Sequence, residues 1–306
     1  DFSFMDGDRK PRSIPEAMLG PGILAASDPP IRMVWIDAAN PVVMLPESMT
    51  TQHALKTREL TVVVDSFLTD TAECADIVLP TTTMLEEDDL VGAYGHHWVA
   101  EVNAVVEAPD GVKSDLDILN CLAPRVGLEA EFSLSTTEWK RRILRPESAG
   151  GIALEALSDA AVRIPDAKAV LFADRKFKTP TGRVNLTVEA PTALAALSPD
   201  RPLLLTAQSF AKTQGSQWLP GEQDDWLPAT IHPESASGFN DGDIAIIEAE
   251  SGQLTVRLKF DDRQRRDTVL VPKGGWLSKN RCTNTLIKAQ MTDAGGGAAY
   301  LDTAVA

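Results

Sequence analysis

The chain has 306 residues, of which 43% are hydrophobic and 24% are charged, with a net charge of -15 at neutral pH. These values are ordinary for a soluble globular protein with one large domain or two domains of average size. The negative charge argues against sequence-independent binding of nucleic acid, because it would repel phosphate backbones. A membrane-spanning helix is not expected either, since no apolar run reaches the roughly 20 residues it needs.

The cysteines and the first residues set the expected compartment. Cys74, Cys121 and Cys282 are scattered without a CxxC spacing, so neither a zinc site, an iron–sulfur frame nor a disulfide scaffold is expected. This favours a reducing, cytoplasmic compartment. The chain begins DFSFMDGDRK, with neither an initiator Met nor a signal leader. We therefore expect the later part of a longer protein, whose start could still carry a signal for the periplasm.

Three short buried strands are predicted in the first third of the chain. They cover residues 31–36, 61–65 and 76–79. A helix is expected over residues 50–58, with Thr50 or Thr51 as its cap. A brief helix should start at Asp70, where Glu73 completes a capping box. This βαβαβ order predicts a parallel sheet with right-handed crossovers.

Polar side chains follow the carboxyl ends of these strands, where open α/β sheets bind their ligands. Asn40 precedes a proline after the first strand, and Asp65 ends the second. The turn at residues 37–41 lacks the glycines of a dinucleotide fingerprint, and there is no P-loop motif. The Asp65 carboxylate could accept from the N1 and N2 edge of guanine or from two ribose hydroxyls, and spacing does not choose between them. The sequence predicts a nucleotide-sized ligand at this edge.

The next stretch offers weaker signals. The acidic run at residues 86–89 favours a solvated loop over a divalent-metal site. His96 and His97 follow in a glycine-hinged loop, where one could contact a ligand, but adjacent side chains diverge too much to share a metal. A helix should run from Ser114 or Asp115 to Gly127, with Asp115 as a cap or as a ligand acceptor.

The rest of the chain divides into a connection and a second domain. A short basic helix at residues 139–144 closes the first domain. The following Ala- and Pro-rich region contains a hairpin-like segment at residues 177–186. Closely spaced strands then predict a small β-barrel. They cover residues 203–206, 244–247, 254–260 and 268–272.

Several motifs together resemble one family. In the first domain they are Asn40-Pro41, Asp65, Thr69-Asp70-Thr71-Ala72, Ala75-Asp76-Ile77-Val78-Leu79-Pro80, Glu86, Gly92-Ala93-Tyr94-Gly95 and Lys113-Ser114-Asp115. This domain resembles the later pterin-binding domain of the molybdopterin oxidoreductases, the dimethyl-sulfoxide-reductase family. The second domain resembles the family's C-terminal cofactor-binding barrel, from residues 203–206 through 241–243 to Trp276 and Asn284. The resemblance covers most of residues 30–306.

The resemblance implies a fold and a cofactor. The fold would be α/β, with a Rossmann-like domain at residues 1–145, a connection at 146–199 and a double-psi β-barrel at 200–306. The cofactor would be bis(molybdopterin guanine dinucleotide) with molybdenum or tungsten, serving two-electron oxygen-atom or hydride transfer. The residues that would hold guanosine are Asn40, Val64, Asp65 and Asp115. The residues that would hold pterin and phosphate groups are Thr206, Gln208, Ser209, Gln214, Gly215, Trp276 and Asn284.

The resemblance also implies what this chain would need from elsewhere. The metal ligand and the cysteines of a [4Fe–4S] cluster lie earlier in the family's chain, so no catalytic residue is assigned here. The partners would be the N-terminal part of the same enzyme or a separate subunit, together with an electron-transfer subunit. Many relatives have an Arg-containing loop where this chain has residues 96–99, which leaves substrate and electron acceptor open.

Two other interpretations stay open at this point. One is a non-catalytic scaffold without metal, as in a large subunit of respiratory complex I. Its weakness is that a scaffold has less need for Asn40, Asp65 and Asp115 together. The other is an unrelated nucleotide-binding module, which would prefer adenine nucleotides.

Overall fold

The computed structural model describes residues 12–92, 94–186, 197–211, 215–293 and 296–306. The chain forms two compact units. The first combines Asp1–Val78 with Pro191–Ala306, and the second is the intervening Leu79–Ala190. The domain boundaries expected near residues 145 and 199 stay a prediction. No helix of the described residues is long and apolar enough to cross a membrane.

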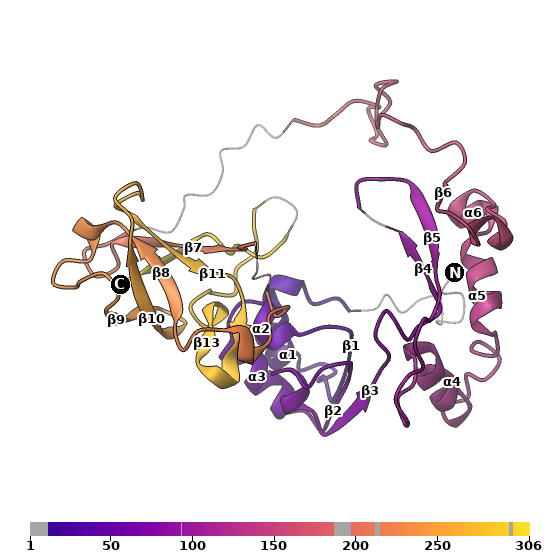
Figure 1. Ribbon diagram of the computed structural model, residues 1–306, viewed down its shortest axis with the longest axis horizontal. Helices are drawn as coiled ribbons and strands as arrows, with labels where there is room; N and C mark the ends of the chain where they lie inside the picture. The colour runs from indigo at the N-terminus through magenta and orange to yellow at the C-terminus, as the bar shows by residue number, and fades with distance from the viewer. Residues whose placement is uncertain (1–11, 93, 187–196, 212–214, 294–295) are drawn as a thin grey trace. The chain divides into compact units, whose positions relative to one another are not determined.

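A small parallel sheet starts the first unit (Figure 1). Its strands are β1 (Met33–Asp37), β2 (Leu60–Asp65) and β3 (Ile77–Pro80), in the order β1-β2-β3. β1 and β2 are parallel, with Asp37 opposite Val64. The positions of the three predicted strands are confirmed. The expectation that the third is buried is wrong, because Ile77 and Val78 of this edge strand are 46% and 38% exposed.

Short helices accompany this sheet. They are η1 (Glu16–Met18), α1 (Leu19–Ala25), α2 (Pro41–Met44), α3 (Ser48–Lys56) and η2 (Ala72–Cys74). Apolar residues of α1 and α3, including Ile23 and Leu55, pack with Ile36 of β1 and Val63 of β2 into one core.

The predicted helix starts are wrong at two places, for the same physical reason. α3 begins after Glu47, whose φ is 52°. The Glu47 N–H donates to the carbonyl of Ile287 at 2.8 Å, and its carboxylate accepts from Ala289 N at 3.0 Å. Asp70 does not cap η2 either, because its carboxylate is bonded to a later part of the chain. Tertiary contacts therefore override the local capping signals.

A six-stranded mixed sheet, curled into half a barrel, forms the rest of the first unit (Figure 1). Its order is β14-β7-β11-β8-β10-β9. These strands are β7 (Leu203–Gln208), β8 (Leu227–Ile231), β9 (Ile244–Ala249), β10 (Gly252–Phe260), β11 (Thr268–Pro272) and β14 (Thr303–Val305). The four predicted strands are confirmed, whereas β8 and β14 had not been predicted. Alternating apolar residues such as Leu205, Val256 and Val269 fill its core.

The connections of this sheet carry short elements. They are the two-stranded β12 (Gly275–Trp276) and β13 (Arg281–Cys282), with η4 (Pro220–Glu222), η5 (Pro233–Ser235), η6 (Leu277–Lys279) and η7 (Thr283–Thr285). Gly275 has a φ of 111°, and a Cβ there would lie 1.6 Å from the carbonyl oxygen of Arg281. Only glycine fits that position.

The second unit combines a three-stranded sheet with helices (Figure 1). Its elements are β4 (Asp89–Gly92), β5 (Trp98–Val102), α4 (Asp115–Val126), α5 (Thr136–Ile143), α6 (Pro146–Ala149), η3 (Leu154–Leu157) and β6 (Val162–Arg163). The predicted helix that ends at Gly127 is confirmed, with Ser114 as its cap. The predicted basic helix at residues 139–144 is present as the later part of α5.

The hairpin-like segment at residues 177–186 contains a turn without strands. Gly182 has a φ of 66° and donates to the carbonyl of Thr179 at 3.0 Å, so the predicted turn is present. The flanking residues form no ladder, and Val184 and Leu186 are exposed. A lone two-stranded ribbon without a core to cover it is marginal in water, which explains the difference.

Candidate ligand-binding site

A cavity of about 720 Å³ lies at the carboxyl end of β1 in the first unit. It is lined by the turn from Asp37 to Pro41, by Met44 of α2 and by Ser216 and Gln217 of the loop after β7. Its volume is in the range of small-molecule and cofactor sites. The position is the edge that the βαβ order predicts for a ligand.

Asn40 lines this cavity and has a buried donor without a partner among the described residues. Its side chain is only 8% exposed and lines the cavity. Its Oδ1 accepts from the Thr71 hydroxyl at 2.7 Å, whereas its Nδ2 has no hydrogen-bond partner among the described residues. A buried amide without a partner costs about 1–3 kcal/mol, so an acceptor on a ligand would be stabilised here.

Asp65 and Val64 lie at the same edge, one strand away. The Val64 carbonyl accepts from Ala38 N at 3.1 Å, which ties the end of β2 to the turn after β1. Asp65 is half-buried, and its Oδ1 accepts from Phe67 N at 3.0 Å. Asp65 does not line the 720 Å³ cavity. Asn40 and Asp65 thus lie at the ends of neighbouring parallel strands, but only Asn40 lines the cavity.

The predicted residues after β7 lie at varying depth. Thr206 is half-buried, Gln208 and Ser209 are exposed, and Gln214 lies outside the described residues. Gly215 has a φ of 59°, and a Cβ on it would lie 2.5 Å from the sulfur of Met44. This close approach brings the next residues, Ser216 and Gln217, to the cavity that Asn40 lines.

Trp276 and Asn284 are buried and bonded within the protein. The indole N–H of Trp276 donates to the Trp218 carbonyl at 2.7 Å. The Asn284 amide donates to the carbonyl of Leu45 at 3.1 Å. Neither residue lines the cavity, so in this structure both join segments that are distant in the sequence.

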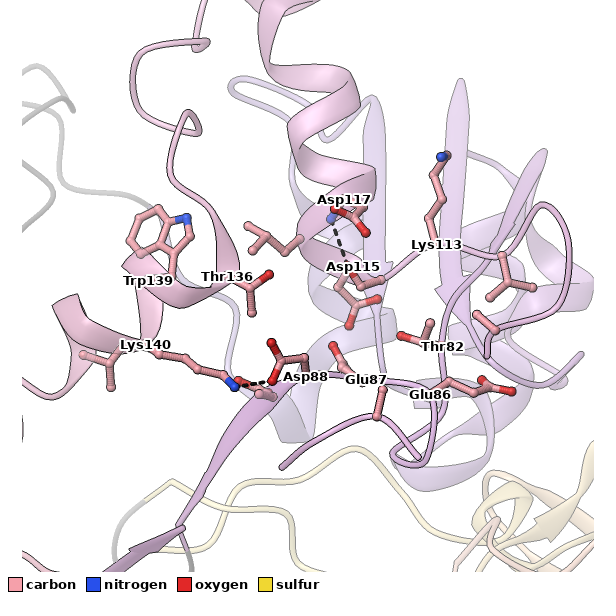
Figure 2. A pocket seen from close by; sticks show the side chains of 17 residues that line it. Thr82, Glu86, Glu87, Asp88, Lys113, Asp115, Asp117, Thr136, Trp139 and Lys140 are labelled. Carbon is pink, nitrogen blue, oxygen red and sulfur yellow. Dashed lines mark hydrogen bonds and ion pairs between the residues drawn. The ribbon is translucent and has the colours of Figure 1, made fainter. Parts of the chain in front are cut away.

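Asp115 lines a separate cavity, of about 510 Å³, in the second unit. Ser114 caps α4 by accepting from Asp117 N at 3.1 Å, which leaves Asp115 in the first turn of the helix. Its Oδ1 accepts from the Thr81 hydroxyl at 2.5 Å. Figure 2 shows the side chains of Asp115, Thr82 and Asp88 directed toward one shared space.

A buried lysine holds part of the acidic run that lines this second cavity. Lys140 of α5 is bonded to Asp88 and, at 2.9 Å, to Glu101 of β5. Burial alone would lower the pKa of Lys140, but the hydrogen bonds to Asp88 and Glu101 outweigh it and raise the pKa. Asp88 and Asp89 are exposed, as expected for a solvated run, and Asp88 is in addition tied to α5. No group of three or more metal-binding side chains occurs among the described residues.

The two predicted histidines stay outside both cavities. His96 is exposed and His97 is half-buried in the loop between β4 and β5, and Trp98 N donates to His96 Nδ1 at 3.2 Å. Their contact with a ligand stays a prediction.

Sequence reasoning missed two residues that organise this region. Asp70 is 2% exposed, and its carboxylate accepts from Leu277 N at 2.7 Å and from Ser278 N at 2.9 Å. Thr71 holds the side chain of Asn40. Both belong to the Thr69-Asp70-Thr71-Ala72 motif, which signalled the family but not these contacts.

Comparisons with known proteins give matches in both resembling parts of the chain. The family model "Molybdopterin oxidoreductase" matches residues 18–125, and "Molydopterin dinucleotide binding domain" matches residues 208–304. The chain is 28% identical to "Probable oxidoreductase YyaE" of Bacillus subtilis, over 92% of this chain and 45% of the relative. It is 28% identical to the "Assimilatory nitrate reductase catalytic subunit" of the same organism, over 80% of this chain and 38% of the relative.

A solved structure shares the fold. Acetylene hydratase from Pelobacter acetylenicus matches with a TM-score of 0.71 and 19% identity, over 94% of this chain and 42% of that one. The chain thus spans less than half the length of the relatives it matches. Two family models, each placed over one of the two resembling parts, and relatives that match along nearly the whole chain lead to one conclusion. The chain belongs to the molybdopterin oxidoreductase family.

Proposed function

We propose that this chain forms part of an oxidoreductase that carries bis(molybdopterin guanine dinucleotide) with molybdenum or tungsten. The observation that carries the proposal is Asn40, a residue that lines the cavity and whose buried Nδ2 donor is unpaired among the described residues. Such a dinucleotide is rich in hydrogen-bond acceptors, since it contains phosphate oxygens and the guanine carbonyl. The residues present therefore fit the group.

The backbone around the cavity supports the same ligand. The close approach of Gly215 to the Met44 side chain brings the loop after β7 against α2, next to the cavity. Glycine at such a place lets a ligand or a second backbone come close. The exposed Gln208 and Ser209 extend the polar surface at the end of β7.

The proposed roles follow from these positions. Asn40, the Val64 backbone and Asp65 would hold one guanosine end at the sheet edge. Asp115 stays proposed as a further guanosine-binding residue. Thr206, Gln208, Ser209, Gln214 and Gly215 would contact pterin and phosphate groups. For Trp276 and Asn284 the internal hydrogen bonds favour support of that surface over direct contact.

The chemistry would be divided between the group and the protein. When bound, the metal–pterin group supplies two-electron transfer, either of an oxygen atom or of a hydride. The residues of this chain bind and orient the group, and none is proposed as catalytic. The finer fold assignment that goes with this role is a Rossmann-like first domain and a double-psi second domain.

The proposed partners are the parts of the enzyme that supply the metal ligand. They would be either the upstream part of the same polypeptide or a separate subunit, with a [4Fe–4S] cluster there and an electron-transfer subunit beyond it. The extra length of the relatives supports this. We place the enzyme in the cytoplasm, since Cys74, Cys121 and Cys282 are all free thiols.

The ligand proposal is tested by thermal unfolding with nucleotides that stand in for the dinucleotide tail. GDP should raise the melting temperature more than ADP at equal concentration, because a ligand that binds the folded state stabilises it. Asp65→Asn should weaken GDP binding by about 10- to 100-fold, since a charge-assisted hydrogen bond contributes roughly 1.5–3 kcal/mol. Asp262→Asn, an exposed control, should leave the shift unchanged.

The same experiments separate the alternatives. A larger shift with ADP would favour an unrelated nucleotide-binding module. A purified enzyme without metal and without a fluorescent pterin after denaturation would favour the metal-free scaffold. No response to either nucleotide by the unaltered protein would refute the proposed site.

A further inference from the structure

Thr71 is a buried residue whose hydroxyl group touches the ligand-facing side chain. Its side chain is fully buried, at the start of η2. Its Oγ1 donates to Asn40 Oδ1 at 2.7 Å and accepts from Val42 N at 3.1 Å. Val42 is in the first turn of α2, directly after the turn that lines the cavity. One hydroxyl therefore connects the start of that helix with the side chain of Asn40, which lines the cavity.

The donor and the acceptor that the Thr71 hydroxyl contacts fix the orientation of the Asn40 amide. A backbone N–H can only donate, so the bond with Val42 uses a lone pair of the hydroxyl and leaves its single proton to be donated. Oδ1 of Asn40 accepts that proton. If the amide were rotated by 180°, Nδ2 would face the hydroxyl and the proton would lose this acceptor. Thr71 thus favours the orientation in which Nδ2 lies away from it.

Neighbouring residues hold Thr71 in place. The hydroxyl of Thr69 accepts from Ala72 N at 3.1 Å, and the Asp70 carboxylate binds two backbone N–H groups of the segment after β12. Thr71 therefore lies between Asp70 and Ala72, and these hydrogen bonds fix both of those residues. Its hydroxyl has little freedom to follow Asn40 into another arrangement.

We propose that Thr71 is a positioning residue, which holds Oδ1 of the Asn40 amide and so leaves the donor, Nδ2, for a ligand that reaches this side chain. The site then selects a ligand atom that accepts, such as a carbonyl or phosphate oxygen, and disfavours an amino group there. This rests on the proposed function for the identity of the ligand. The orientation itself does not, and it can be tested without a ligand.

The ligand-free test is a double-mutant cycle in urea unfolding with Thr71→Val and Asn40→Ala. The loss of the Val42 hydrogen bond occurs in both variants that carry Thr71→Val, so it cancels in the cycle. The stability lost in the double variant should be smaller than the sum of the losses in the two single variants. The difference should correspond to about tenfold in the unfolding equilibrium constant. Thr51→Val is the matched control, because Thr51 is equally buried in the same unit and has no bond to Asn40. It should be additive with Asn40→Ala.

The ligand test measures GDP binding to the same protein by calorimetry. Thr71→Val should weaken GDP binding about tenfold, and Thr71→Ser, which keeps the hydroxyl, should bind within twofold of the unaltered protein. Should Thr71→Val fail to fold, Asn40→Asp replaces it, because it puts an acceptor where the donor stood and should weaken GDP at least as much.

Each outcome decides the matter. Additivity of Thr71→Val with Asn40→Ala, or equal GDP binding by Thr71→Val, would overturn the positioning role. The positioning role would also be overturned if Thr71→Ser weakened GDP binding as much as Thr71→Val does. Coupling in the cycle without GDP binding by the unaltered protein would refute the proposed function and support the orientation.

Discussion

Asp70 joins the first sheet of the chain to its last third, and its removal should destabilise the first unit strongly. The carboxylate is 2% exposed and accepts two hydrogen bonds, at 2.7 and 2.9 Å, from Leu277 N and Ser278 N. Hydrogen bonds to charged groups contribute roughly 1.5–3 kcal/mol each. In Asp70→Asn one oxygen still accepts, but the amide nitrogen then faces a backbone N–H. We expect a loss of about 2–4 kcal/mol in the free energy of unfolding.

Urea unfolding followed by tryptophan fluorescence measures this loss, since Trp276 directly precedes the two donors. The matched control is Glu222→Gln, an exposed carboxylate that accepts one backbone N–H, from Leu219, at 2.7 Å. It should cost less than about 1 kcal/mol, because water replaces the lost contact. An Asp70→Asn loss as small as that of the control would refute the reasoning.

Three further substitutions test separate features. Ala38→Gly should raise the free energy of unfolding by about 0.5–1 kcal/mol in urea titrations, because Ala38 has a φ of 48°, which glycine adopts without strain. Gly275→Ala should cost more than about 3 kcal/mol and lower the melting temperature, since its Cβ would meet a backbone carbonyl oxygen at 1.6 Å. Lys140→Met should destabilise the second unit by about 3–5 kcal/mol in chemical denaturation, because it leaves two carboxylates without their buried partner. The pKa of Lys140 is raised on folding, so its contribution should be complete below the ordinary lysine pKa of about 10.4 and be lost as the pH rises through the raised value.

Contrary results have distinct meanings. A loss of stability in Ala38→Gly would show that the turn is not strained. A Gly275→Ala protein with the original melting temperature would place β12 and β13 farther apart than described. If the free energy of unfolding of Lys140→Met changed with pH above pH 10 as that of the unaltered protein does, titration of the lysine would not be the cause of that change.

Apolar runs were sufficient to place the strands of the first sheet and four of the six strands of the second, because a run of apolar residues indicates a strand whichever strand it pairs with. β8 was missed because Pro228 lies inside it, and a proline speaks against an internal strand. The structure tolerates it because β11 pairs only with the later residues Thr230 and Ile231 of β8. Helix starts were less predictable, since Glu47 and Asp70 act through residues more than 200 positions away.

The candidate site was predictable as an edge and not as a set of contacts. Asn40 and Asp65 could be placed after neighbouring strands because parallel strands end at one edge. That Asn40 lines the 720 Å³ cavity and Asp65 does not depends on loop conformation, which no periodicity reports. The hydrogen bond from Thr71 spans 31 positions, so the residue could be recognised as part of a motif but not assigned its task.

The first unit is built from two stretches of sequence separated by the whole of the second unit, and this sets an order for folding. The hydrogen bonds of Glu47 and Asp70 to residues 277–289 cannot form until the ribosome has released those residues. Residues 79–190 are continuous in sequence and can collapse earlier, because closing short loops costs less entropy. A nascent chain stalled between residues 190 and 277 would therefore leave the first unit incomplete, a state in which chaperones and proteases compete for it.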